Sequence, residues 1–232
     1  MARATTFAFC VGLTAGPAAA DCRLALALAF DVSHSVSAVD YQIQRGGIVA
    51  ALRAPDIRRA FMAPGGSVAL SIFEWGGRNF QDLVLDWTLI TSDADLDRVV
   101  ALMAAHQQSP VWQPTALGSA LIYADELIAR APDCLQYTLD VSGDGRSNDG
   151  IGPAKVFAER PFAGVTVNGL TIGDHEADIT DYYRAEVIRG AGAFVVAAHR
   201  HTDFPQVIRM KLARELSGPV IGSAAFALRP AG

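Results

Sequence analysis

The sequence contains very little lysine, and its basic residues are outnumbered by its acidic ones. Only Lys155 and Lys211 are lysines among 19 basic residues, and 24 acidic residues give a formal net charge of -5. A nucleic-acid-binding protein normally carries a basic face, so this balance argues against a nucleic-acid partner. No apolar run reaches the roughly 18 residues that cross a membrane, so no transmembrane segment is expected after removal of the N-terminal signal.

The N-terminal segment has the pattern of a secretory signal peptide. Arg3 supplies a positive charge, residues 5–14 form a short and mostly apolar stretch, and Ala18-Ala19-Ala20 offers a cleavage site. We therefore expect residues 1–20 to be a signal peptide, and the mature chain to be exported to the periplasm or extracellular space of a bacterium. A frayed N-terminal helix is the alternative.

Cysteine is scarce as well. Cys10 would leave with the signal peptide, so Cys22 and Cys134 remain, and an even pair in an exported chain indicates a disulfide. Cys22 lies nine residues before Asp31, and Cys134 lies ten residues before Asp144. If these aspartates end adjacent parallel strands, the two cysteines start those strands side by side. We expect a Cys22–Cys134 disulfide, with two unpaired buried thiols as the alternative.

The remaining composition is that of a folded domain, with 232 residues, 51% hydrophobic and 19% charged. Apolar patterns predict strands at residues 24–30, 67–75, 80–87, 134–142, 165–172 and 193–197. Helical spacing predicts helices at 39–53, 93–106, 115–130, 179–188 and 204–216, with Ser92 as an N-cap. This alternation predicts an α/β fold: a single doubly wound, mostly parallel sheet with helices on both faces. The Gly76-Gly77 turn makes 80–87 an antiparallel edge strand. We expect one domain over residues 21–216 and a loose tail over 217–232.

The first predicted strand leads directly into an Asp-x-Ser-x-Ser loop formed by Asp31, Ser33 and Ser35. Open parallel sheets bind ligands at the carboxyl ends of their strands. One carboxylate and two hydroxyls at alternate positions can converge on one side of a tight loop. These hard oxygen ligands suit Mg²⁺ or Mn²⁺. His34 occupies an odd position in the loop and is expected to point away from the ligands.

Two later segments supply matching oxygens. Thr115 follows Pro114 just before a predicted helix, and Asp144 lies between two glycines after the strand at 134–142. Asp31, Ser33, Ser35, Thr115 and Asp144 are therefore expected to meet on one rim of the sheet, from three loops. The alternatives are local: the aspartates could form turns or cap helices, and Thr115 could be a plain N-cap.

This set resembles the metal-ion-dependent adhesion site (MIDAS) of von Willebrand factor A-type domains, which present the same residue types in the same chain order. The sequence also resembles a family of exported bacterial proteins of unknown function built on that domain. The similar segments lie within residues 24–216 and read LALAFDVSHSVSAVDYQIQRGG, VALSIFEWGG, PTALGSAL, DVSGDGRSNDG, TVNGLTI and DYYRAEVIRGAGAFVV. Two dipeptides depart from the common pattern: Gln113-Pro114 replaces Gly-Gly, and Ser142-Gly143 replaces Leu-Thr or Ile-Thr.

The resemblance implies a function without catalysis. In that family a divalent ion keeps one position open, and an acidic group of a partner protein fills it. We therefore expect an exported binding module that holds Mg²⁺, with Mn²⁺ or Ca²⁺ possible, and engages an unknown protein partner through a carboxylate.

Other functions fit less well. A phosphotransferase of the haloacid dehalogenase type needs a second acid two residues after the nucleophilic Asp, and Ser33 stands there. A serine hydrolase needs a Gly-x-Ser-x-Gly segment, which the sequence lacks. A structural envelope protein with a degenerate metal site remains the main alternative to a binding module.

Overall fold

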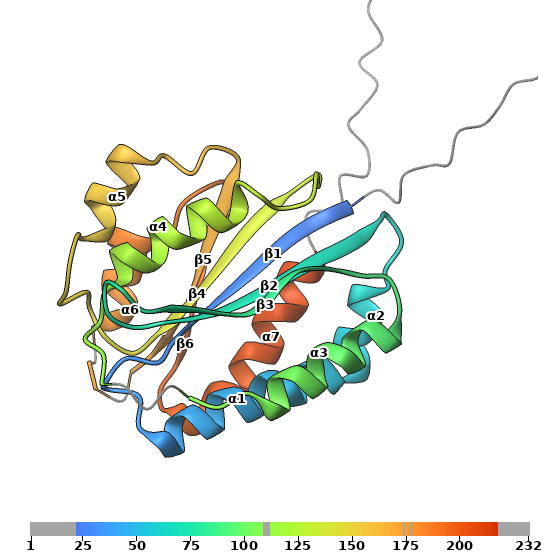
Figure 1. Ribbon diagram of the computed structural model, residues 1–232, viewed down its shortest axis with the longest axis horizontal. Helices are drawn as coiled ribbons and strands as arrows, with labels where there is room; N and C mark the ends of the chain where they lie inside the picture. Colours follow the sequence, from blue (N-terminus) through green and yellow to red (C-terminus); the bar gives the residue numbers. More distant parts are fainter. Residues whose placement is uncertain (1–21, 109–111, 174, 177, 218–232) are drawn as a thin grey trace, which may run out of the picture.

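The computed structural model describes residues 22–108, 112–173, 175–176 and 178–217. The predicted signal peptide and, apart from Ser217, the predicted tail lie outside the described residues. Within this part, a central sheet is covered by helices on both faces (Figure 1).

One sheet of six strands runs through the molecule in the order β3-β2-β1-β4-β5-β6. The strand β3 pairs with β2 in antiparallel orientation, and every other pair is parallel. This confirms the predicted α/β fold and its antiparallel edge strand. The strands are β1 (Cys22–Asp31), β2 (Ser67–Trp75), β3 (Gln81–Ile90), β4 (Tyr137–Gly143), β5 (Val165–Ile172) and β6 (Val195–Ala198).

The helices divide between the two faces of the sheet (Figure 1). One face carries α1 (Ala38–Arg53), α2 (Pro55–Phe61), α3 (Asp93–Ala105) and α7 (Phe204–Ser217). The other carries α4 (Leu117–Ile128), α5 (Pro153–Glu159) and α6 (Ile179–Tyr182). A π-helical turn, η1 (Tyr183–Val187), continues α6, and a 3-10 turn, η2 (His201–Asp203), precedes α7.

The alternation in β1 explains why this strand lies at the centre. Leu26, Leu28 and Phe30 pack towards α1 and α7, whereas Ala27 and Ala29 pack towards α4. Because all five side chains are buried, the strand is apolar on both faces, as expected of a central parallel strand.

Several element boundaries differ from those predicted. The helix expected at 115–130 begins only at Leu117, and the strand expected at 134–142 begins at Tyr137, because Cys134 forms only an isolated bridge. The helices α2 and α5 were not predicted. Each has seven residues and starts at a proline, which is too short for a helical period to stand out. The Ser92 cap of α3 is confirmed: the Ser92 hydroxyl accepts from the Asp95 amide, and the Asp95 carboxylate accepts from the Ser92 amide in return.

The predicted disulfide is confirmed. Cys22 and Cys134 are bonded, and their Cα atoms lie 4.5 Å apart. The bond joins the start of β1 to the segment that leads into β4, two strands that end at the predicted metal site. In the described part of the chain, no helix has the length and apolar character needed to cross a membrane.

Candidate metal centre

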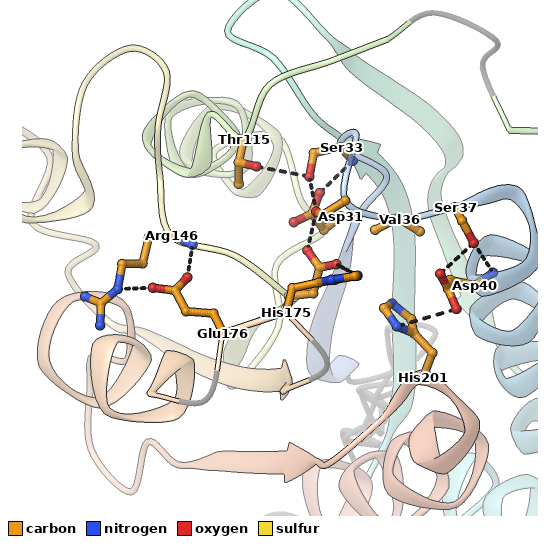
Figure 2. Close-up of polar contacts among 12 residues, drawn as sticks. Asp31, Ser33, Val36, Ser37, Asp40, Thr115, Arg146, His175, Glu176 and His201 are labelled. Carbon is orange, nitrogen blue, oxygen red and sulfur yellow. Dashed lines mark hydrogen bonds and ion pairs between the residues drawn. The ribbon is translucent and has the colours of Figure 1, made fainter.

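The carboxyl ends of β1 and β4 bring the two predicted aspartates together. Asp31 is the last residue of β1, Asp144 follows directly after β4, and these two strands are neighbours in the sheet. Ser33 and Ser35 lie in the turn after β1. Thr115 lies in the loop before α4, and its hydroxyl points towards Ser33 (Figure 2). Three separate loops therefore supply the five side chains.

A chain of hydroxyl contacts connects these side chains. The Thr115 hydroxyl donates to the Ser33 hydroxyl at 3.1 Å, and the Ser33 and Ser35 hydroxyls lie 3.2 Å apart. Ser35 Oγ then donates to Asp144 Oδ1 at 2.6 Å, while Asp31 Oδ1 accepts from the Ser33 amide at 2.7 Å (Figure 2). All five predicted residues thus belong to one continuous cluster.

Both carboxylates in the cluster are fully buried and incompletely satisfied. Asp31 and Asp144 are each 0% exposed, and the Oδ2 atom of each lacks a hydrogen-bond partner among the described residues. His175 Nε2 lies 3.8 Å from Asp144 Oδ2. Buried charges in proteins are normally paired or bound to a metal ion, because isolated ones are costly. Two carboxylate oxygens that accept no hydrogen bond, beside three hydroxyls, therefore fit a divalent cation that prefers oxygen ligands.

The electrostatics of the cluster point the same way. Burial, followed by the charge of Asp144, raises the pKa of the Asp31 carboxyl to about 8. Burial also raises the pKa of Asp144, although the hydrogen bond from Ser35 acts in the opposite direction. Two neighbouring buried carboxylates resist ionising together, and a divalent ion would remove that penalty.

The capping alternative for Thr115 is not what the structure shows. Ala116 occupies the N-cap position of α4 and makes no side-chain capping bond. The Thr115 hydroxyl donates to Ser33 instead, while the Thr115 amide donates to Asn148 Oδ1 at 2.9 Å. Thr115 is therefore held in the loop with its hydroxyl in the cluster.

Tyr183 is a site residue that the sequence did not predict. Its hydroxyl is buried without a hydrogen-bond partner in the described structure, and burial and the charge of Asp31 raise its pKa well above the usual value. A Cβ on Gly143 would collide with this hydroxyl and lie 3.1 Å from Asp31 Oδ2. Gly143, which departs from the common family pattern, thus makes room for Tyr183 beside Asp31. The π-helical turn that carries Tyr183 has no clear sequence signal.

The raised pKa of Asp31 predicts how metal-free stability changes with pH. Its carboxyl keeps a proton in the native state that the unfolded chain releases near pH 4, so the free energy of unfolding falls as pH rises from about 4 to about 8. Over the part of this range between about pH 5.5 and about pH 8, the fall should be smaller by about 1–3 kcal/mol in Asp31→Asn. Urea unfolding in EDTA measures both. Equal pH dependence in the two proteins would contradict the burial of an unpaired Asp31.

Comparison with known proteins places the chain in a family. Residues 21–220 match the model of the family DUF1194, whose description is "Protein of unknown function". The chain belongs to this family. No curated protein matches the sequence of this DUF1194 chain.

Solved structures similar to the DUF1194 chain share its fold. Proximal thread matrix protein 1 from the mussel byssus has a TM-score of 0.62 and 13% identity, over 85% of this chain and 49% of that protein. A von Willebrand factor type A protein from Catenulispora acidiphila has a TM-score of 0.58 and 14% identity, over 84% and 43%. The pilus adhesin SpaC from Lactobacillus rhamnosus GG has a TM-score of 0.59 and 12% identity, over 84% and 30%. The DUF1194 chain thus spans less than half of each protein, and the likeness confirms the predicted von Willebrand factor A-type fold.

Proposed function

We propose that this DUF1194 protein is an exported binding module that engages a partner protein through a divalent ion. Asp31, Ser33, Ser35, Thr115 and Asp144 would hold the ion, and an acidic group of the partner would complete its coordination. The observation that carries the proposal is the pair of fully buried aspartates, each with one oxygen that accepts no hydrogen bond among the described residues, beside three linked hydroxyls.

The charge of the protein favours an ion-mediated contact. A chain with a formal net charge of -5 would repel an acidic group, and a bound divalent cation reverses the charge locally. Beside the Ser33–Ser35 turn, the exposed rings of His34 and Trp112 lie 4.9 Å apart, and Trp112 is 64% exposed. We assign this aromatic pair to the surface that surrounds the ion, because exposed aromatic residues are enriched in protein interfaces.

The choice of ion follows from the ligand types. Carboxylate and hydroxyl oxygens favour Mg²⁺, with Mn²⁺ and Ca²⁺ as substitutes. A further structure of the mussel protein is described as having a zinc-occupied MIDAS motif, and SpaC is described as an adhesin. Both descriptions support a metal-dependent binding role for a domain of this fold.

We also propose that the protein is exported and that it binds its partner without catalysing a reaction. The signal-peptide pattern of residues 1–20 and the Cys22–Cys134 disulfide support an oxidising compartment, the periplasm or the extracellular space. A phosphotransferase would need an acid where Ser33 stands, and Ser33 instead bonds to Thr115 within the cluster. A structural role with a degenerate site is less well supported, because all five oxygen ligands are together.

The test is metal-dependent capture of a partner. The immobilised protein is exposed to an envelope extract of its source organism in Mg²⁺, and bound proteins are eluted with EDTA. We expect a partner that is retained by wild type and by the surface control His199→Gln but lost with Asp31→Ala. Substituting acidic residues of that partner by their amides should identify one carboxylate whose loss abolishes binding. Retention of the same partner by Asp31→Ala would refute the proposal.

A further inference from the structure

A second group of metal-binding side chains lies outside the cluster described above. The ligand atoms of Glu74, Asp82 and His106 all lie within 4.8 Å of one another. His106 Nε2 is 3.2 Å from Glu74 Oε2 and 3.8 Å from Asp82 Oδ2. These residues come from β2, β3 and the end of α3, and none of them belongs to the Asp31 cluster.

The fold places two of these carboxylates directly opposite each other. Glu74 and Asp82 are cross-strand partners in the antiparallel pair β2–β3. Like charges in this relation destabilise a sheet. His106, the C-cap residue of α3, faces both carboxylates. Arg45 fixes this end of the helix by donating to the carbonyl oxygens of Ala104 at 2.7 Å and His106 at 2.8 Å.

Two atoms at the centre of the group are buried without a hydrogen bond. Glu74 is 3% exposed, and the Tyr41 hydroxyl donates to its Oε1 at 2.8 Å. Its other oxygen, Oε2, has no hydrogen-bond partner in the described structure, and neither has His106 Nε2. The two atoms lie 3.2 Å apart, within ion-pair distance. Tyr41 thus orients Glu74 so that its Oε2 atom lies towards the histidine.

We propose that Glu74, Asp82 and His106 form a second metal site, specific for a transition-metal ion such as Zn²⁺. One imidazole and two carboxylates suit Zn²⁺, whereas Mg²⁺ and Ca²⁺ prefer oxygen ligands alone. Two ligand atoms at about 2.1 Å from a tetrahedral ion lie about 3.4 Å apart, close to the observed 3.2 Å and 3.8 Å separations. The Asp82 side chain is 50% exposed, so the ion can enter from solvent and keep a water ligand.

The test separates this site from the Asp31 cluster. Asp31→Ala protein without a histidine tag is stripped of metal, and Zn²⁺ binding is measured by competition with a chromophoric chelator. We expect one equivalent of Zn²⁺ to bind and an excess of Mg²⁺ to leave it in place. Adding His106→Gln should weaken Zn²⁺ binding at least about 100-fold, since even changes to residues behind a ligand cost 10–100-fold. The matched control His199→Gln, an exposed histidine, should bind Zn²⁺ unchanged.

A third variant guards against misfolding. Asp82 is half exposed, so Asp82→Asn should fold normally, as circular dichroism can verify, and still weaken Zn²⁺ binding at least about tenfold. The proposal is overturned if Asp31→Ala protein binds no Zn²⁺, or if binding survives both His106→Gln and Asp82→Asn. Because the test is made without Asp31, its outcome is independent of the proposed partner-binding function.

Discussion

Replacing Asp31 with alanine is expected to abolish the stabilisation that Mg²⁺ gives to the protein. Asp31 is fully buried, and its Oδ2 atom has no hydrogen-bond partner among the described residues. An ion that binds with a dissociation constant of about 1 mM stabilises a fold by about 1.4 kcal/mol when supplied at about 10 mM. Thermal unfolding with EDTA and with Mg²⁺ should show this shift in wild type and none in the variant.

The same substitution should have an unusual effect in EDTA. The substitution removes a carboxyl whose ionisation is opposed by burial and then by the charge of Asp144, so Asp31→Ala should be at least as stable as wild type without metal. Asp133→Ala, at an exposed position, is the control and should retain the full Mg²⁺ response. A Mg²⁺ shift of equal size in Asp31→Ala would show that the ion binds elsewhere.

Lys211 is a buried cation that lies between two carboxylates, and its removal is expected to destabilise the protein strongly. It is 0% exposed, and its Nζ atom lies 2.6 Å from Asp140 Oδ1 and 2.5 Å from Glu215 Oε1. Asn168 also donates to Glu215 Oε1, at 2.8 Å. Burial and then Glu215 raise the pKa of Asp140 to about 7, while the Lys211 ammonium lowers it. Through this ion cluster the helix α7 is joined to the central strand β4.

Lys211→Met is expected to destabilise the protein by about 3–5 kcal/mol, because it leaves two buried carboxylates without their cation. Urea unfolding at neutral pH measures the loss. The deficit should shrink in acid, because the raised pKa of Asp140 lets its carboxyl take up a proton in the folded variant. Lys155→Met is a matched control, since Lys155 is the other lysine of the chain and is exposed, and should change stability by less than about 0.5 kcal/mol. A loss below about 1 kcal/mol in Lys211→Met would contradict this role.

The fold and the Asp31 cluster could be predicted because their signals are local in the sequence. A fully apolar run such as residues 24–30 indicates a buried strand, and the residues just after it must lie at the edge of the sheet. Once β1 and β4 are neighbours, Asp31 and Asp144 have to meet. The same reasoning placed Cys22 beside Cys134 at the opposite ends of these strands.

The second metal-binding group, the Lys211 ion cluster and Tyr183 could not be predicted in this way, because tertiary packing brings their side chains together and no local sequence pattern indicates it. Glu74 and Asp82 face each other only because of the register between β2 and β3, and His106 reaches them only because α3 ends there. Lys211 resembles any polar residue of an amphipathic helix until α7 packs on the sheet. Tyr183 lies beside Asp31 because a π-helical turn carries it there and because Gly143 has no side chain that would collide with its hydroxyl. Distances between such residues follow from the fold and not from sequence spacing.

The most direct measurement is a crystal structure of the protein with Mn²⁺, located by its anomalous scattering. We expect a peak within about 2.5 Å of the Ser33 and Ser35 hydroxyls, beside Asp31 and Asp144, with an open coordination position facing solvent. In Asp31→Ala crystals grown in the same solution this peak should be missing. A structure with full Mn²⁺ occupancy at another place and none between Asp31 and Asp144 would contradict the proposed metal-dependent binding site.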